Sequence, residues 1–216
     1  MRIIVYVEGP SDKAALELLL SPVIESKRQS GVTIEFFEAP NGDKKKSMVF
    51  KVPVRAANIL RHSADTVVVA LPDLYPKNKG LEHETTTQLQ QGIVSAFRRA
   101  LQHSNVDDMR LLDRFFVFCL KHDLEALVLA AEDALAWRLG KKQLKRSWVV
   151  PVEDQNHDRP PKVVVEELFM QEGRRYKETV DAPAVLSRVG YKEIAERCPQ
   201  CFGPFVEFLE QVGQRE

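Results

Sequence analysis

Acidic side chains stand just after two apolar, β-branched segments of this 216-residue chain. Glu8 follows residues 3–7, and Asp73 follows residues 66–71. Segments of this kind predict buried strands of a parallel sheet, and open α/β sheets bind ligands at the carboxyl ends of their strands. Carboxylates gathered there repel one another unless a cation lies between them. The pattern therefore predicts an oxygen-rich site for Mg²⁺ or Mn²⁺, ions that activate water in phosphodiester hydrolysis.

A further pair, His122 and Glu125, follows the apolar residues 115–120. The two side chains are about one helical turn apart and would face the same side of a helix. His122 is a candidate for catalysis and Glu125 for metal binding; alternatively, His122 caps its helix or bonds a neighbouring carboxylate. Three strands are thus expected to deliver Glu8, Asp73 and this pair to one rim of the sheet.

Two lysine-bearing connections border the same predicted rim. One lies between a predicted strand over residues 32–38 and a predicted helix over residues 49–62, and the other follows Asp73. Such lysines either meet the phosphates of a nucleic acid or belong to solvated loops. The candidates for phosphate contact are Lys44, Lys45, Lys46, Lys77 and Lys79.

Strands and helices alternate through the first two thirds of the chain, which predicts an α/β fold with a mainly parallel four-stranded sheet flanked by helices. Beyond Trp137 the pattern changes to a basic segment, a polar loop over residues 154–161 and short segments broken by proline and glycine. We expect a core over residues 1–140 and a mostly helical C-terminal extension over residues 141–216. The extension is predicted to complete the same domain and site.

Composition narrows the classes of function. Lys plus Arg and Asp plus Glu both number 31, so no overall basic field favours nucleic acid, and any such surface must be local. No signal peptide or long apolar span is evident, which predicts a cytoplasmic protein without a membrane partner. Cys198 and Cys201 form half of a zinc site at most, and Cys119 is expected in the core. A small-molecule phosphotransferase lacks support because no glycine-rich phosphate loop is present.

Several short segments together resemble a known family. Their order along the chain resembles the Toprim fold of topoisomerases, primases and the OLD (overcoming lysogenisation defect) nucleases. More closely, it resembles small stand-alone bacterial Toprim-like proteins that are often encoded beside ATPases. The segments that carry the resemblance are residues 7–12, 72–75, 122–127, 160–162, 176–180 and 194–199.

The resemblance implies a role for four of these residues. Glu8 would match the Toprim glutamate that ligates metal or acts as general base, and Asp73 the metal-binding aspartate. Asp12 would match the second acid of the OLD-type turn, although a helix N-cap explains it equally well. Lys162 would match the lysine that stabilises the transition state, and we expect its ammonium within about 10 Å of Glu8 and Asp73.

The chain departs from the Toprim pattern at one position. Toprim enzymes usually carry Asp-x-Asp, whereas this chain has Asp73-Leu74-Tyr75. One metal ligand is therefore missing unless Glu125 or His122 supplies it. Tyr75 either stacks on a base or serves in packing.

The sequence predicts a metal-dependent nuclease that cuts DNA or RNA with Mg²⁺ or Mn²⁺. Because the net charge is zero, we expect it to gain substrate affinity from a partner, and the resemblance implies an ATPase of a phage-defence system. Self-association is left open. The alternative is a non-catalytic Toprim-like module that binds a partner protein or nucleic acid.

Overall fold

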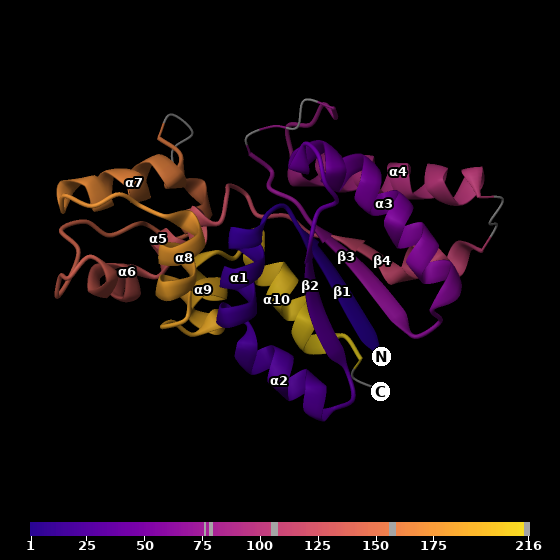
Figure 1. The fold of residues 1–216 in the computed structure, drawn as a ribbon, viewed down its shortest axis with the longest axis horizontal. Coiled ribbons are helices and arrows are strands. Elements are labelled where there is room, and N and C mark those ends of the chain that lie inside the picture. Colours follow the sequence, from indigo (N-terminus) through magenta and orange to yellow (C-terminus); the bar gives the residue numbers. More distant parts are fainter. Residues whose placement is uncertain (76, 78–79, 105–107, 156–158, 214–216) are drawn as a thin grey trace. The chain divides into compact units, whose positions relative to one another are not determined.

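The core of the fold is a four-stranded parallel sheet with the strand order β2-β1-β3-β4 (Figure 1). The structure is a computed structural model that describes residues 1–75, 77, 80–104, 108–155 and 159–213. The strands are β1 (Arg2–Val7), β2 (Thr33–Glu38), β3 (Thr66–Leu71) and β4 (Phe115–Val117). Helices flank the sheet, so the predicted α/β, Toprim-like fold class with a four-stranded parallel sheet is confirmed.

Ten α-helices and two short 3₁₀ segments are found in the described part of the chain. The helices are α1 (Pro10–Leu19), α2 (Ser21–Gln29), α3 (Lys44–His62), α4 (Thr86–His103), α5 (Glu125–Ala130), α6 (Glu132–Arg138), α7 (Pro161–Gln171), α8 (Glu178–Leu186), α9 (Tyr191–Arg197) and α10 (Phe202–Gln211). The 3₁₀ segments are η1 (Met109–Arg114) and η2 (Val152–Asp154).

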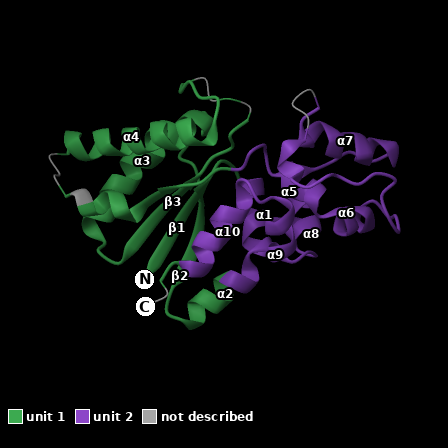
Figure 2. Cartoon of the chain, turned by 180° about the vertical axis from the view of Figure 1, so that it is seen from behind, with its two compact units in different colours: residues 1–9, 24–119, 212–216 green, residues 10–23, 120–211 purple. Residues whose placement is uncertain are grey.

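The chain divides into two compact units, which Figure 2 colours separately. The sheet unit consists of residues 1–9, 24–119 and 212–216, and the helical unit consists of residues 10–23 and 120–211. The predicted boundary after residue 140 therefore falls inside the helical unit. That the C-terminal part completes the site of the core stays a prediction.

Strand register places the ends of β1 and β3 side by side in the sheet unit. Val7, the last residue of β1, pairs with Leu71, the last residue of β3. Both strands are apolar and buried along nearly their whole length, as parallel strands covered on two faces require. Glu8 and Asp73 consequently leave the sheet at the same edge.

Helix α3 begins at Lys44, five residues before the predicted start of this helix. The Asp43 carboxylate accepts a hydrogen bond from the backbone N–H of Lys46 at 3.1 Å and so caps the first turn. The prediction of a lysine-bearing loop is wrong for this reason, since the three lysines form the first turn of a helix. Apolar side chains then anchor α3: Met48, Val52, Ala56 and Leu60 are buried.

The helical unit is built around α5, which contacts α6, α7, α8 and α9, while α1 packs on α8. Its buried aromatic core includes Phe169, Phe202 and Phe205. The buried Glu153 carboxylate accepts hydrogen bonds from the backbone N–H groups of residues 200, 201 and 202 and thereby caps α10. No helix of the described residues is both long and apolar enough to cross a membrane.

Candidate functional site

Two acids and a lysine meet at the carboxyl edge of the sheet. The backbone N–H of Asp73 donates a hydrogen bond to Glu8 Oε1 at 3.1 Å, which ties the two strand ends together. Lys45 Nζ lies 3.5 Å from Glu8 Oε2 and 3.8 Å from Asp73 Oδ2. The predicted proximity of Glu8 and Asp73 thus holds in the sheet unit, with a lysine between their carboxylates.

Both carboxylates are largely withdrawn from solvent. The side chains of Glu8 and Asp73 are 11% and 12% exposed. Burial raises the pKa of Glu8, although the charge of Lys45 and the hydrogen bond from Asp73 oppose the shift. This carboxyl group therefore costs free energy when it is ionised, and a second cation at the site would lower that cost.

The other predicted phosphate-binding lysines of the sheet unit differ in their surroundings. Lys44 bonds the Ala39 carbonyl at 3.0 Å and lies 3.4 Å from Glu38. Lys46 is exposed, and within the described residues it forms no ion pair. Only Lys45 contacts the acid pair directly, whereas its two neighbours in the chain do not.

The segment after Asp73 is held by Glu84. Tyr75 donates its hydroxyl hydrogen bond to the Glu84 carbonyl at 3.2 Å, and Lys77 forms an ion pair with the Glu84 carboxylate. Tyr75 thus bonds within its own loop. Lys79 lies outside the described residues.

A second charged cluster lies within the helical unit. Lys162 Nζ donates to Glu178 Oε2 at 2.5 Å, and Ser11 Oγ donates to Glu178 Oε1 at 2.5 Å. These bonds join the N-terminal ends of α1, α7 and α8. Pro161 occupies the first turn of α7 and thereby fixes the backbone beside Lys162.

Glu125 lies at the buried end of this cluster and has no exposed surface. Burial and the charges of Asp123 and Glu178 together raise its pKa to about 8, although Lys162 opposes the shift. The buried Tyr176 side chain lies next to Glu125 and interacts with it electrostatically. Neither side chain makes a hydrogen bond of ordinary geometry within the described residues.

Asp12 and His122 also belong to the helical unit. Asp12 lies in the first turn of α1 and is 8% exposed, and His122 is 3% exposed. The charge of His122 helps to lower the pKa of Asp154, after the larger effect of the hydrogen bond from Lys121. The predicted site residues thus form two groups: Glu8, Asp73 and Lys45 in one unit, and Asp12, His122, Glu125 and Lys162 in the other. Their convergence on a single rim, with Lys162 within about 10 Å of Glu8, stays a prediction.

Comparison with known proteins assigns the chain to a family. The profile described as Domain of unknown function (DUF4276) matches residues 7–210. The chain belongs to the DUF4276 family. Nearly the whole chain, including every predicted site residue, lies within the matched range. A search of curated proteins finds no match.

The fold of the DUF4276 chain is similar to that of a solved region of an OLD protein. The C-terminal region of the Burkholderia pseudomallei OLD protein is similar over 98% of both chains, with 14% sequence identity and a TM-score of 0.50. The C-terminal region of the Xanthomonas campestris pv. campestris OLD protein covers 95% of this chain and 96% of that chain, with 13% identity and a TM-score of 0.42. The first likeness confirms the predicted resemblance to OLD proteins at the level of fold.

The acid pair of the DUF4276 chain fits an open magnesium site. Mg²⁺ prefers oxygen ligands and commonly takes only one or two protein carboxylates, with water and substrate phosphates completing its shell. Glu8 and Asp73 supply two such carboxylates beside each other. A closed site of protein ligands is not formed, since no three His, Cys, Asp or Glu side chains in the described part of the chain gather around one point.

Glu178 and Tyr176, which belong to the charged cluster of the helical unit, are not among the predicted site residues. Glu178 bonds both Lys162 and Ser11, although 167 positions separate it from Ser11. Residues 176–180 form one of the segments that resemble the Toprim-like family, so a signal was present. Residue spacing alone could not assign a partner to a carboxylate on a separate helix.

Proposed function

We propose that the chain is a metal-dependent nuclease that hydrolyses phosphodiester bonds of DNA or RNA with Mg²⁺ or Mn²⁺. We further propose that it acts in the cytoplasm as the effector partner of an ATPase in a bacterial anti-phage defence system. The observation that carries the nuclease proposal is the buried pair Glu8 and Asp73 at the carboxyl edge of the sheet, with Lys45 between their carboxylates. The OLD-like fold provides a scaffold on which such a site can be built, but a fold by itself does not imply a function.

Electrostatics explain why this pair suits a metal and a phosphate. Two carboxylates that are mostly buried repel each other and require a nearby cation. In the structure Lys45 provides that cation, at 3.5 Å and 3.8 Å. When a divalent ion is bound, it would supply activation of water and neutralisation of phosphate charge. Lys45 would then be released to contact a substrate phosphate at the same edge.

Lys162 is the second cation in the proposal. Its pKa is raised because the hydrogen bond and charge of Glu178 and the charge of Glu125 outweigh the effect of burial. The ammonium therefore stays charged at neutral pH, as a group that stabilises negative charge on a phosphate must. Glu178 orients it, and Ser11 in turn orients Glu178.

The zero net charge of the chain supports an ATPase or another protein as partner. Nucleic-acid affinity arises mainly from contacts between cationic side chains and phosphates. Several lysines and arginines here are bound to carboxylates of the same chain, including Lys44 and Lys77. A partner that presents substrate would supply the missing affinity.

A cleavage assay tests the proposal. The purified chain is incubated with plasmid, with oligonucleotides and with transfer RNA in Mg²⁺, in Mn²⁺ or in excess chelator, with and without an ATPase encoded beside its gene. We expect cleavage that requires the metal and is lost in Asp73→Asn. Absence of cleavage under all of these conditions would contradict the nuclease proposal.

The alternative is a non-catalytic module that binds a partner protein or nucleic acid. Two observations favour it: Tyr75 stands where a second aspartate is usual, and a lysine already neutralises the acid pair. This alternative predicts that divalent ions leave the thermal melting of the protein unchanged. The nuclease proposal predicts instead a rise in melting temperature with added Mg²⁺, because the ion binds only the folded acid pair.

Lys45→Met should bind Mg²⁺ more tightly than the parent chain. Removal of the ammonium leaves the carboxylates of Glu8 and Asp73 without their nearest cation, so the ion no longer competes with a lysine. A unit charge about 4 Å away is worth about 1 to 4 kcal/mol near a protein surface, so we expect a gain of about tenfold. Titration calorimetry measures the affinity.

Lys44→Met is the matched control for this variant. Lys44 lies one position earlier in the same helical turn but contacts Glu38 and the Ala39 carbonyl. Its replacement should leave Mg²⁺ affinity within about twofold of the parent value. Equal or weaker binding by Lys45→Met would show that the lysine does not compete with the metal.

A further inference from the structure

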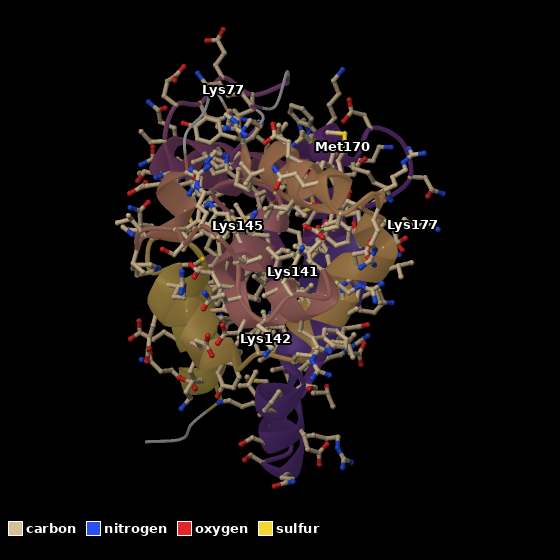
Figure 3. The ribbon with its side chains drawn as sticks, turned by 90° about the vertical axis from the view of Figure 1, so that its left-hand side faces the viewer. Lys77, Lys141, Lys142, Lys145, Met170 and Lys177 are labelled. Atoms are coloured by element: carbon tan, nitrogen blue, oxygen red, sulfur yellow. The ribbon has the colours of Figure 1, made fainter. Side chains whose placement is uncertain are left out.

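A pocket lies within the helical unit, and none of its lining residues belongs to the cluster formed by Lys162, Glu178 and Glu125. It has a volume of about 470 Å³ and lies between the segment of residues 139–148 and helix α7. Apolar side chains form part of its lining: Leu139, Leu144, Val164 and Leu168. Four lysine and arginine side chains also line it, and Figure 3 shows Lys141 and Lys145 on this side of the molecule.

The charges that line the pocket do not cancel. Lys141 forms an ion pair with Glu172 at 2.7 Å, and Arg159 forms one with Glu167. These two are the only carboxylates among the lining residues. Lys145 and Arg146, both exposed, form no ion pair with any described residue. The pocket therefore carries an excess of two positive charges beside an apolar lining.

Trp148 adds a rigid aromatic group whose buried indole N–H lacks an acceptor among the described residues. Its backbone N–H donates to Glu132 at 3.0 Å, and its carbonyl accepts from Arg197 at 3.2 Å, so the residue is fixed at both ends. The side chain is 4% exposed, and the guanidinium of Arg146 lies 6.0 Å from its ring. The indole N–H has no acceptor among the described residues, which is a cost that a bound acceptor would remove.

We propose that this pocket binds one nucleotide unit of a single-stranded nucleic acid, a substrate class that rests on the proposed nuclease function. Lys145 and Arg146 hold phosphate, and the apolar lining and the guanidinium plane of Arg146 receive the base. The indole N–H of Trp148 donates to an oxygen of the ligand. A nucleotide combines the three required features: negative charge, a flat ring with an apolar face, and hydrogen-bond acceptors.

The size of the pocket favours this ligand over a folded partner. Pockets for small ligands commonly span about 300 to 1,000 Å³, and 470 Å³ lies within that range. An amphipathic helix would require an extended apolar groove instead. An acidic peptide satisfies the charge but not the flat ring, and it serves below as the competing probe.

Tryptophan fluorescence tests the proposal without any catalytic step. The chain has two tryptophans, so Trp137→Phe leaves Trp148 as the sole reporter. This variant is titrated in excess chelator with 5′-phosphorylated hexathymidylate and hexauridylate, and with hexaglutamate as the peptide probe. We expect a saturable change in Trp148 emission with an oligonucleotide and a much smaller change with the peptide. Anisotropy of a labelled oligonucleotide on the unaltered chain provides a second measurement.

The pocket variant is Lys145→Gln with Arg146→Gln, and the control is Lys142→Gln. Lys142, labelled in Figure 3, is exposed and lies in the same basic segment. It is not among the residues that line the pocket. We expect the pocket variant to lose at least about tenfold in oligonucleotide affinity. Its log-log salt dependence should fall by about 1.4, since each phosphate contact on a single strand contributes about 0.7. The control should change neither quantity by a comparable amount.

Three results would overturn the assignment. They are an absence of binding by both methods, binding that the pocket variant retains in full, and an equal response to hexaglutamate. The outcome is independent of the proposed chemistry, because the titration needs no metal. Binding that persists in Glu8→Gln while cleavage is lost would support both proposals, whereas cleavage without pocket binding would remove this one alone.

Discussion

Glu8→Gln is expected to reduce phosphodiester cleavage by about 100-fold or more while the protein stays folded. The substitution removes a negative oxygen from the proposed metal site, and a group that handles protons or a metal in the transition state commonly contributes at least that factor. The glutamine carbonyl can still accept the hydrogen bond that Asp73 N–H now donates to Glu8 at 3.1 Å. The link between the two strand ends therefore survives the change.

The stability of Glu8→Gln separates a functional glutamate from a structural one. Burial raises the pKa of Glu8, so the folded state holds this proton more tightly than the unfolded state does. The stabilising effect of that proton is present at low pH and lost as the pH rises through the folded pKa. At neutral pH and without metal, the variant should melt at the same temperature as the parent or higher. A marked loss of stability would indicate a structural role.

Glu38→Gln is the matched control for the cleavage assay. Glu38 ends β2, the strand beside β1, and lies 3.4 Å from Lys44, so it too is a strand-end carboxylate next to a lysine. Its side chain is 41% exposed. Its ion pair is with Lys44, whereas Asp73 pairs with Lys45. Full cleavage activity in Glu38→Gln and loss in Glu8→Gln would assign the effect to the buried pair. Equal rates in Glu8→Gln and the parent chain would contradict the catalytic role.

The two central strands, β1 and β3, follow from the sequence because they are nearly continuous apolar runs, as strands buried on both faces are. Strand β3, predicted over residues 66–71, has those bounds in the structure. Strand β4 ends at Val117, three residues before its predicted end. Cys119 and Leu120 beyond that point are buried although they lie outside the strand, and an apolar sequence pattern alone cannot distinguish the two cases.

The sequence predicts the candidate site only where the order and direction of the strands determine which residues lie together. Parallel neighbouring strands bring their carboxyl ends together, so the pairing of Glu8 with Asp73 could be predicted. Which of three successive lysines reaches that pair depends on where α3 begins, and this start depends on the Asp43 cap. The partners of Lys162 could not be predicted, because they depend on how three short helices pack.

The contributions of Glu125 and Glu178 to the free energy of unfolding should change in opposite directions as the pH rises. That of Glu125 should fall, and that of Glu178 should grow. The pKa of Glu125 is raised to about 8 by burial and by the charges of Asp123 and Glu178. The pKa of Glu178 is lowered because hydrogen bonds from Lys162 and Ser11 outweigh the effect of burial. Variants of these two carboxylates, which lie in one cluster, therefore serve as controls for each other.

For Glu125, the folded pKa lies above the unfolded value, so the contribution to stability is complete below about pH 4.5 and lost as the pH rises towards 8. The glutamine of Glu125→Gln cannot ionise, so this variant does not lose that contribution to stability as the pH rises. With each pKa unit worth about 1.4 kcal/mol, the variant should exceed the parent at about pH 9 by up to roughly 4 kcal/mol in unfolding free energy. The difference should shrink towards pH 5, where the parent carboxyl is largely protonated.

For Glu178, the folded pKa lies below the unfolded value, so its contribution is present above about pH 4.5 and lost as the pH falls through the folded pKa. Glu178→Gln should destabilise the protein at neutral pH by about 1 to 2 kcal/mol, because the charged hydrogen bond from Lys162 is weakened. Urea denaturation in excess chelator from pH 4 to pH 9 measures both variants. A Glu125→Gln chain less stable than its parent at pH 9 would mean that Glu125 is held ionised by a cation, and the assignment of a buried, protonated carboxyl would be wrong.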